Sequence, residues 1–384
     1  MTTPGSGSGP GLAVSQVDRD HADQAVAQAG LRSHPGELAA AAEDWASAPA
    51  VGLDTEFVRE RTFHPRPGLI QASDGHKVWL LDAVELAKMP ELGDLLNDRQ
   101  RTKILHSVGE DMEVFRILTN TVPDPLFDTQ IAAAMLGRPL QLRYEQLVAE
   151  TLGVELAGGK ARSNWCKRPL TRDLLTYAAQ DVIWLPRLYQ YLAEQLQTAG
   201  RLHWLHEDCA RLVQSARTDD PGSPLLRVKG AGRLSDAALA VLERLAEWRE
   251  QTARQRDLPR SFVIRDDDLL RLAEQAARGL LDQTLRALPD PVRRRYRDQI
   301  AAIAEQEAPS NFTRPAALVA LHPDQRAWIA EAQQSIRTLA ENMGIEPALI
   351  ASKRELTRIA RGEHPDWLDG WRGPLLGEAL PATP

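Results

Sequence analysis

Two acidic segments of the chain carry side chains that could hold metal ions. Asp54 and Glu56 lie two residues apart at the end of an apolar run that predicts a strand, so both carboxylates point to one face of it. Asp111 follows the turn residue Gly109 at the predicted start of a helix. Taken singly, each segment has an ordinary explanation, because acidic residues are common at strand ends and in the first turns of helices. Carboxylates brought together, however, repel one another unless a cation lies between them.

A third segment, Tyr177-Ala-Ala-Gln-Asp181, places a phenol and a carboxylate on one face of a predicted helix. Asp181 falls in a mostly apolar stripe, where a carboxylate without a partner is costly. Hard oxygen ligands from three segments suit two divalent ions about 3.5–4 Å apart, with Asp54 bridging them. The set therefore predicts bound Mg²⁺ or Mn²⁺ and phosphodiester hydrolysis, with Tyr177 orienting or deprotonating the attacking water.

Composition and length exclude several classes of protein. The chain of 384 residues is long enough for two or three domains, and 46 Lys and Arg against 53 Asp and Glu give a net charge of −7. That charge argues against a protein that coats nucleic acid by bulk charge. The two cysteines lack any ligand spacing, which excludes a disulfide scaffold and a zinc module. Without a signal peptide or an apolar run of about 18–20 residues, the chain is expected to be cytoplasmic, monomeric and free of membranes.

The order of the expected elements divides the chain. Residues 1–30 are rich in Gly, Ser and Pro and then polar, and they predict a disordered tail. Strands followed by helices over residues 33–215 predict an α/β domain, and residues 216–232 predict a linker. Beyond the linker, apolar residues at helical spacing predict two all-α domains, at residues 233–305 and 320–382.

The motifs resemble those of the ribonuclease D family, in the tyrosine branch of the DEDD 3′→5′ exonucleases. That branch places Tyr four residues before the last Asp of the set, as Tyr177 stands to Asp181, whereas the histidine branch would have His at the position of Thr176. The helical part resembles helicase-and-RNase-D C-terminal (HRDC) modules in Leu245-Ala-Glu-Trp-Arg-Glu and Gly370-Trp-Arg-Gly-Pro-Leu. The resemblance implies a ribonuclease H-like mixed-sheet exonuclease domain followed by two all-α HRDC-like domains, the second divergent.

The resemblance also implies roles for particular residues. The family's metal ligands fall on Asp54, Glu56, Asp111 and Asp181, and its catalytic tyrosine on Tyr177. The implied reaction is the metal-dependent release of 5′-mononucleotides from RNA 3′ ends, above all those of tRNA precursors and other structured RNAs. One departure is Asn164, where the family's Arg-Ser-Asp-Trp segment has Asp, so that side chain keeps its shape and loses its charge.

Six further residues could contact the substrate: Phe57, Gln71, His106, Lys160, Arg162 and Arg168. The three basic ones follow a Gly-Gly turn and could hold RNA phosphates, although a solvated loop explains them equally well. Phe57 could stack on the terminal base beside Gln71, although core packing is the commoner role of such a ring. The many arginines of the first helical block could likewise follow RNA or belong to a mixed-charge surface.

Two other functions fit the same sequence. A DNA exonuclease of the same branch would share every catalytic residue, because nothing in the motifs recognises a 2′-hydroxyl. A non-catalytic scaffold could bind RNA or protein through the helical domains, with a vestigial acidic site. The intact catalytic positions argue against the scaffold, and the paired helical domains favour RNA.

Overall fold

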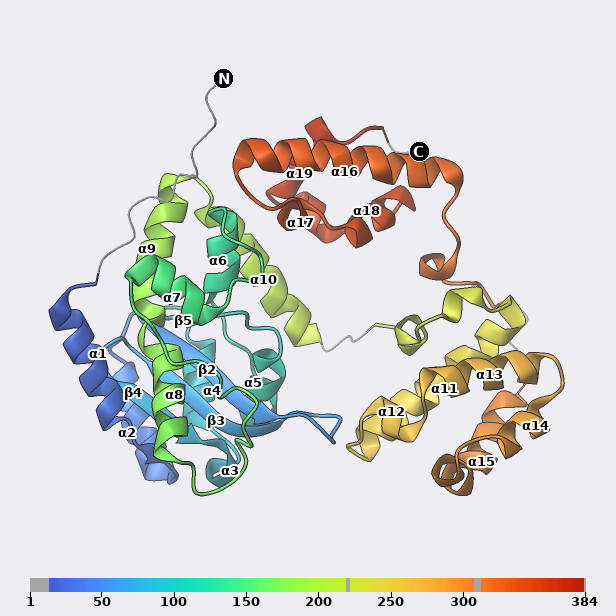
Figure 1. Ribbon diagram of the computed structural model, residues 1–384, viewed down its shortest axis with the longest axis horizontal. Coiled ribbons are helices and arrows are strands. Elements are labelled where there is room, and N and C mark those ends of the chain that lie inside the picture. The colour runs from blue at the N-terminus through green and yellow to red at the C-terminus, as the bar shows by residue number, and fades with distance from the viewer. Residues whose placement is uncertain (1–13, 219–221, 307–311, 383–384) are drawn as a thin grey trace.

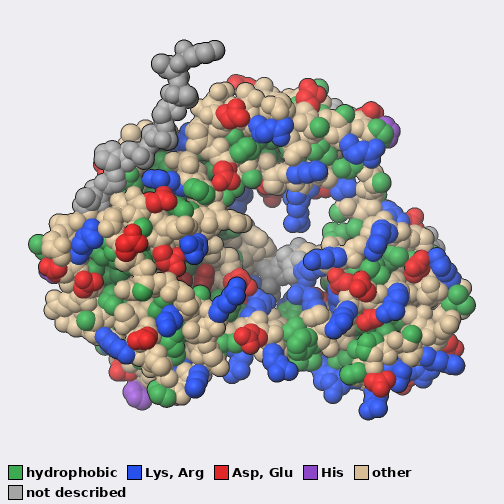
Figure 2. All heavy atoms as spheres, viewed as in Figure 1, with side chains coloured by type: hydrophobic (Ala, Val, Ile, Leu, Met, Phe, Trp, Pro, Cys, Tyr) green, Lys and Arg blue, Asp and Glu red, His purple; other side chains and the backbone are tan. Residues whose placement is uncertain are grey.

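The computed structural model describes residues 14–218, 222–306 and 312–382, which form three bodies (Figure 1). We call them the nuclease body (residues 14–218), the first helical module (residues 222–306) and the second helical module (residues 321–382). The space-filling view shows a hollow between the three bodies, with Lys and Arg side chains on its rim (Figure 2). Within the described ranges, no helix is long and apolar enough to cross a membrane.

A six-stranded mixed sheet lies at the centre of the nuclease body, in the order β1-β4-β3-β2-β5-β6. The β2–β3 and β3–β4 pairs are antiparallel, and the β1–β4, β2–β5 and β5–β6 pairs are parallel. This sheet with its helices confirms the predicted fold class. The strands are β1 (Leu31–Arg32), β2 (Ala50–Val58), β3 (Arg66–Ser73), β4 (Val78–Asp82), β5 (Thr102–Leu105) and β6 (Leu126–Asp128).

Helices cover the sheet and bring the acidic segments to it. Helix α8 packs on β2, β3 and β4, and α9 packs on β2 and β5. The approach is close at Gly52, where a Cβ atom would lie 2.8 Å from Cβ of Leu185, so β2 needs glycine there. The helices of the nuclease body after β1 are α2 (Pro35–Trp45), α3 (Ala83–Leu86), α4 (Pro90–Asn97), α5 (Asp111–Thr119), α6 (Thr129–Met135), α7 (Tyr144–Leu152), α8 (Arg172–Ile183), α9 (Leu185–Thr198) and α10 (Leu202–Thr218).

The predicted N-terminal tail is wrong for part of its length. Residues 1–13 lie outside the described residues, but α1 (Gln16–Gln28) is a helix capped by the Ser15 hydroxyl. Its buried residues Ala22, Ala25 and Val26 follow helical spacing, and the helix packs on α8 and β4. This apolar stripe is narrow and lies among polar residues, so the composition of the segment did not indicate a helix.

The first helical module has a hydrophobic core of its own. Part of the predicted linker belongs to it, since Leu225, Val228 and Ala231 are buried in that core and α10 continues to Thr218. The prediction of a linker was therefore wrong for these residues. It rested on the polar and Gly-rich residues around them, and it missed three apolar residues that pack in the core. The helices of the module are α11 (Asp236–Gln255), α12 (Arg260–Val263), α13 (Asp266–Ala277), α14 (Leu281–Arg286) and α15 (Asp290–Ala304).

The second helical module instead shares a continuous core with the nuclease body. Its contact with α10 stacks Trp371 on Trp204, with ring centroids 4.4 Å apart. Beside them, the buried guanidinium of Arg372 binds both carboxylate oxygens of Asp208, at 2.7 and 2.9 Å. The helices of this module are α16 (Pro323–Met343), α17 (Pro347–Ile350), α18 (Lys353–Ala360) and α19 (Arg372–Ala379).

Candidate active site

Three of the predicted metal ligands meet at the carboxyl-terminal half of β2. Asp54 and Glu56 project from this central strand, and Asp181 approaches from α8, which packs across the strand. One carboxylate oxygen from each of the three lies within 4.8 Å of the others. The alternation of side chains on β2 and the position of Asp181 on α8 therefore bring these groups to one point.

The fourth predicted ligand lies beside this group. Asp111 begins α5, is 9% exposed and accepts a hydrogen bond from the Thr55 hydroxyl. It is not one of the three carboxylates that share the 4.8 Å cluster. Its charge nevertheless acts on Glu56, whose pKa it raises together with burial and the other two acids. Asp111 is thus placed to join the cluster from the α5 side.

All four carboxyl groups have pKa values above their usual range. Burial raises the pKa of Glu56 to about 10, and the neighbouring carboxylates add to this shift. Burial likewise raises the pKa of Asp181 to about 8, although hydrogen bonding with Tyr177 opposes the change. The pKa values of Asp54 and Asp111 are also raised, first by burial and then by repulsion from a neighbouring acid. A cation at this point would replace protons as the balancing charge.

This donor set fits divalent metal ions. All four groups offer hard carboxylate oxygens, the type of ligand that Mg²⁺ and Mn²⁺ prefer. Burial and neighbouring carboxylates raise their pKa values, and a bound cation would offset both effects. Among residues 14–218, 222–306 and 312–382, this is the one group of three or more such side chains close enough to hold an ion.

Tyr177 stands over the cluster from α8. Its side chain is 9% exposed, and its ring lies 6.1 Å from that of Trp165, between centroids. Burial, followed by the charges of Asp181 and Glu56, raises the pKa of the phenol well above its ordinary value. The hydroxyl therefore stays protonated at neutral pH in this environment and can donate a hydrogen bond. Both roles expected for Tyr177, orienting the attacking water and deprotonating it, stay predictions.

Two of the four carboxylates, Asp54 and Asp181, line a cleft of about 160 Å³. Two residues that line this cleft, Tyr144 and Glu145 at the start of α7, were not among the site residues predicted from the sequence. The Tyr144 hydroxyl donates a hydrogen bond to the Gln180 carbonyl at 3.3 Å, and the Glu145 charge adds to the pKa shift of Asp181. No local signal marks Glu145, because an acidic residue in the first turn of a helix is ordinary.

The predicted substrate residues divide into those at the cleft and those away from it. His106 lines the cleft, but its ring nitrogens lie 2.9 Å from the Thr129 hydroxyl and 3.0 Å from the Leu142 carbonyl. Phe57 is half-buried at a shift of the β2–β3 register. Lys160 and Arg162 are exposed in the loop before α8. For all four residues, substrate contact stays a prediction.

Gln71 is a wrong prediction. It lies opposite Asp54 on β3 and is fully buried, so it cannot touch a nucleotide in the cleft. Among the residues that the structure describes, neither polar atom of its amide has a hydrogen-bond partner. The sequence could not show that α8 covers this part of β3.

Arg168 is also wrongly predicted as a phosphate ligand. Its Nε binds the buried carboxylate of Asp82 at 2.7 Å, and its remaining nitrogens donate to the carbonyls of Gly68 and Trp165 at 2.7 and 2.8 Å. The side chain therefore joins the segment before α8 to the sheet. Asn164, the departure from the family motif, accepts a hydrogen bond from the backbone amide of Cys166 at 3.2 Å. The amide oxygen thus closes a local turn without needing a charge.

Comparison with known proteins decides the family. Residues 33–197 match the 3′-5′ exonuclease family, and residues 238–305 match the HRDC domain. Ribonuclease D of Shewanella sp. (strain ANA-3) is 36% identical over 357 residues, which cover 91% of this chain and 92% of the relative. The chain belongs to the ribonuclease D family. Family membership makes it a 3′→5′ exoribonuclease, as the motifs predicted.

Solved structures agree with this assignment to the ribonuclease D family. The crystal structure of Escherichia coli RNase D matches with a TM-score of 0.83 at 31% identity, and the match covers 92% of this chain and 97% of that one. That protein is described as an exoribonuclease involved in structured RNA processing. A protein from Bifidobacterium adolescentis, at 20% identity and a TM-score of 0.67, shares the fold.

Proposed function

We propose that the chain trims the 3′ ends of structured RNAs, tRNA precursors above all, and releases 5′-mononucleotides. Two divalent ions, Mg²⁺ or Mn²⁺, would be held by the side chains of Asp54, Glu56, Asp111 and Asp181. The observation that carries this proposal is the cluster of Asp54, Glu56 and Asp181 carboxylates within 4.8 Å of one another, beside Asp111 and at the edge of a cleft that Asp54 and Asp181 line. The described role of the Escherichia coli relative supports a structured RNA as the substrate.

The residues of the cleft divide the chemical work. Bound ions would supply activation of the attacking water and stabilisation of the leaving 3′ oxygen. The carboxylates would determine where the ions bind, because β2, α5 and α8 hold these side chains on a packed framework. The Tyr177 hydroxyl donates a hydrogen bond toward the water and limits its orientation. Tyr144 and His106 form part of the wall that confines the terminal nucleotide.

The wider organisation remains part of this proposal. An exonuclease domain at residues 33–215, to which α1 adds, would carry the chemistry. The HRDC domain at residues 233–305 and a second, divergent HRDC-like domain at residues 320–382 would hold or select structured RNA. A monomer that acts in the cytoplasm fits the composition.

A direct assay separates this proposal from its two alternatives. A tRNA with a 3′ extension and a single-stranded DNA of matched length, both labelled at the 5′ end, are incubated with Mg²⁺ or Mn²⁺. We expect single-nucleotide shortening of the RNA that stops with EDTA and in the Asp181→Ala variant. Equal or faster shortening of the DNA would support a DNA exonuclease. Binding of the tRNA without shortening would support the scaffold.

A further inference from the structure

The loop between β2 and β3, residues 59–65, leaves the nuclease body and inserts into the first helical module. Figure 1 shows this hairpin extending toward α12. Phe63 at its tip is 6% exposed and belongs to the hydrophobic core of the first helical module. Phe63 thus belongs by sequence to a loop of the nuclease body, but it packs in the core of the first helical module.

The first helical module contacts the loop through polar as well as apolar groups. The guanidinium groups of Arg254 and Arg260 lie 5.4 and 4.7 Å from the centre of the Phe63 ring. One carboxylate oxygen of Asp257 accepts hydrogen bonds from the backbone amides of Phe63 and His64, both at 3.0 Å. Asp257 itself has a φ of 47°, in the left-handed region that few residues with a side chain adopt. The backbone of the module is therefore held in an unusual conformation at the point where it binds the loop.

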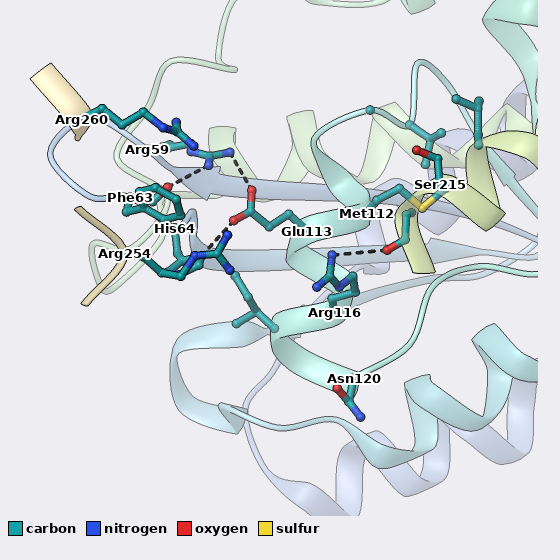
Figure 3. Close-up of a pocket in the computed structure, with 15 residues that line it drawn as sticks. Arg59, Phe63, His64, Met112, Glu113, Arg116, Asn120, Ser215, Arg254 and Arg260 are labelled. Atoms are coloured by element: carbon teal, nitrogen blue, oxygen red, sulfur yellow. Dashed lines mark hydrogen bonds and ion pairs between the residues drawn. The ribbon is translucent and has the colours of Figure 1, made fainter. Parts of the chain in front are cut away.

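On its other side the loop is tied to α5. Arg59 and His64 both contact the Glu113 carboxylate, at 2.8 and 3.0 Å (Figure 3). Arg59 also donates a hydrogen bond to the Phe63 carbonyl at 2.8 Å, which joins the start of the loop to its tip. Glu113 lies in the first turn of α5, two residues after Asp111. The loop therefore links the first helical module to the helix that carries a predicted metal ligand.

The same loop continues directly from β2, the strand that carries two of the other three acids. Asp54 and Glu56 precede it on β2, and the β2–β3 register shifts between Glu56 and Phe57. A cavity of about 480 Å³ is lined by the loop, α5, α10 and the first helical module, and Arg59 and His64 reach Glu113 beside it (Figure 3). The Thr55–Asp111 hydrogen bond joins β2 to α5 directly. The contacts of Arg59 and His64 with Glu113 add a second link, from the loop that follows β2 to the first turn of α5.

We propose that Phe63 and Asp257 are positioning residues for catalysis: by holding the β2–β3 loop, the first helical module sets the position of β2 relative to α5. This inference rests on the metal site proposed above. The module then contributes to the chemical step itself, in addition to any contact it makes with RNA. A module that served only to bind RNA would leave the hydrolysis of a very short substrate unchanged.

The test uses the full-length chain and two substrates, a 5′-labelled diribonucleotide, too short to extend from the cleft onto the module, and a tRNA with a 3′ extension. Asp257→Gly removes the carboxylate while permitting the positive φ, and Asp257→Asn keeps both an acceptor oxygen and tolerance of that φ. Phe63→Ala removes the ring, and Phe262→Ala is its matched control, because Phe262 is exposed on α12. We expect kcat on the diribonucleotide to fall about 10-fold in Phe63→Ala and Asp257→Gly, and to change less than about 2-fold in the other two variants.

Hydrogen exchange supplies a readout that does not depend on activity. In Asp257→Gly, the amides of Phe63 and His64 should exchange faster, and so should those of the first turn of α5. Unchanged kcat on the diribonucleotide with a raised KM for the tRNA would overturn the inference, as would unchanged exchange in α5. A wild-type chain that hydrolyses neither RNA would refute the proposed function, whereas the exchange data would still test the coupling. Melting temperatures show whether the Phe63→Ala variant is folded. If it is not, the comparison of kcat between Asp257→Gly and Asp257→Asn tests the inference.

Discussion

Two buried acidic regions of the molecule are balanced in opposite ways. At the joint between α10 and the second helical module, Asp208 accepts hydrogen bonds from the Arg372 guanidinium and from the Trp371 indole N–H, the latter at 3.0 Å. At the proposed metal site, carboxylate oxygens of Asp54, Glu56 and Asp181 lie within 4.8 Å of one another, and the pKa values of all three groups are raised. The first region has its positive charge built into the chain, and the second depends on one from outside.

This difference separates a structural use of buried charge from a functional one. Burial of a carboxylate destabilises the fold unless hydrogen bonds and an opposite charge compensate for it. Arg372 compensates Asp208, and Arg168 compensates Asp82 in the same way. Where the chain leaves several acids uncompensated in a cleft, stability is lost and a site for cations is gained. Each prediction below changes one side of this contrast.

The largest effect is expected from removing a carboxylate of the cleft. Asp181→Ala should lower kcat on tailed tRNA by about 10³-fold or more, because one of the four groups that fix the ions is lost. Asp173→Asn, an exposed acid in the first turn of the same helix, should leave kcat within about 2-fold. Single-turnover assays with saturating Mg²⁺ measure both. Near-normal turnover in Asp181→Ala would place the chemistry elsewhere.

The next largest effect is expected from removing Arg372, the buried cation between α10 and the second helical module. Arg372→Met should lower the free energy of unfolding by about 2 kcal/mol, because Asp208 would lose two charge-assisted hydrogen bonds and keep Arg211 as its cation. Hydrolysis of a diribonucleotide should continue at the wild-type rate in the folded fraction. Urea unfolding followed by circular dichroism gives the free energy. A loss below about 1 kcal/mol would mean that this joint is not balanced as the structure indicates.

The pH dependence of the stability of the metal-free protein tests whether the carboxylates of the proposed metal site lack a compensating charge. The pKa values of Asp181, about 8, and Glu56, about 10, lie above those of the unfolded chain, so the folded state binds more protons between about pH 4 and these values. In EDTA, stability should therefore fall as the pH rises from 6 to 9, by less than about 1.4 kcal/mol per pH unit for each group. Asp54→Asn should flatten this dependence and raise the melting temperature at pH 8. A wild-type curve that is flat or rising would contradict the raised pKa values.

The smallest effect, of opposite sign, is expected from Lys103. This lysine is fully buried and donates to the carbonyls of Asp98 and Asp124 at 2.7 and 2.6 Å, and burial lowers its pKa to about 7. The unfolded chain binds this proton up to about pH 10, so the lysine makes stability rise with pH between about 7 and 10. With Mg²⁺ bound at the cleft, Lys103→Met should remove a slope of up to about 1 kcal/mol per pH unit. Thermal unfolding at pH 7, 8 and 9 compares the two proteins, and identical slopes would rule out a neutral buried lysine.

Sequence periodicity predicted the elements that carry the site, but not how their side chains are used. Alternation on a strand put Asp54 and Glu56 on one face, and a helical spacing of four put Tyr177 beside Asp181. That β2, α5 and α8 meet at one point came from the family resemblance, because local patterns do not encode which elements pack together.

Long-range contacts account for the errors. Arg168 is engaged by Asp82, 86 residues earlier, and Gln71 is covered by a helix that begins about 100 residues later. Glu145 enters the cleft from a helix with no chemical motif. In each case the decisive partner lies on another element, so no pattern of spacing within one segment could reveal it.

The two ends of the first helical module are tied to the same helix of the nuclease body. Its start follows α10, and its end leads to the second helical module, which is docked on α10 through Trp204 and Asp208. The module therefore cannot diffuse away when the β2–β3 loop detaches, and the loop meets its binding site at a high effective concentration. Detachment becomes a brief local opening that closes again within the same molecule. A weak contact at Phe63 is enough to keep the loop in place for most of the time.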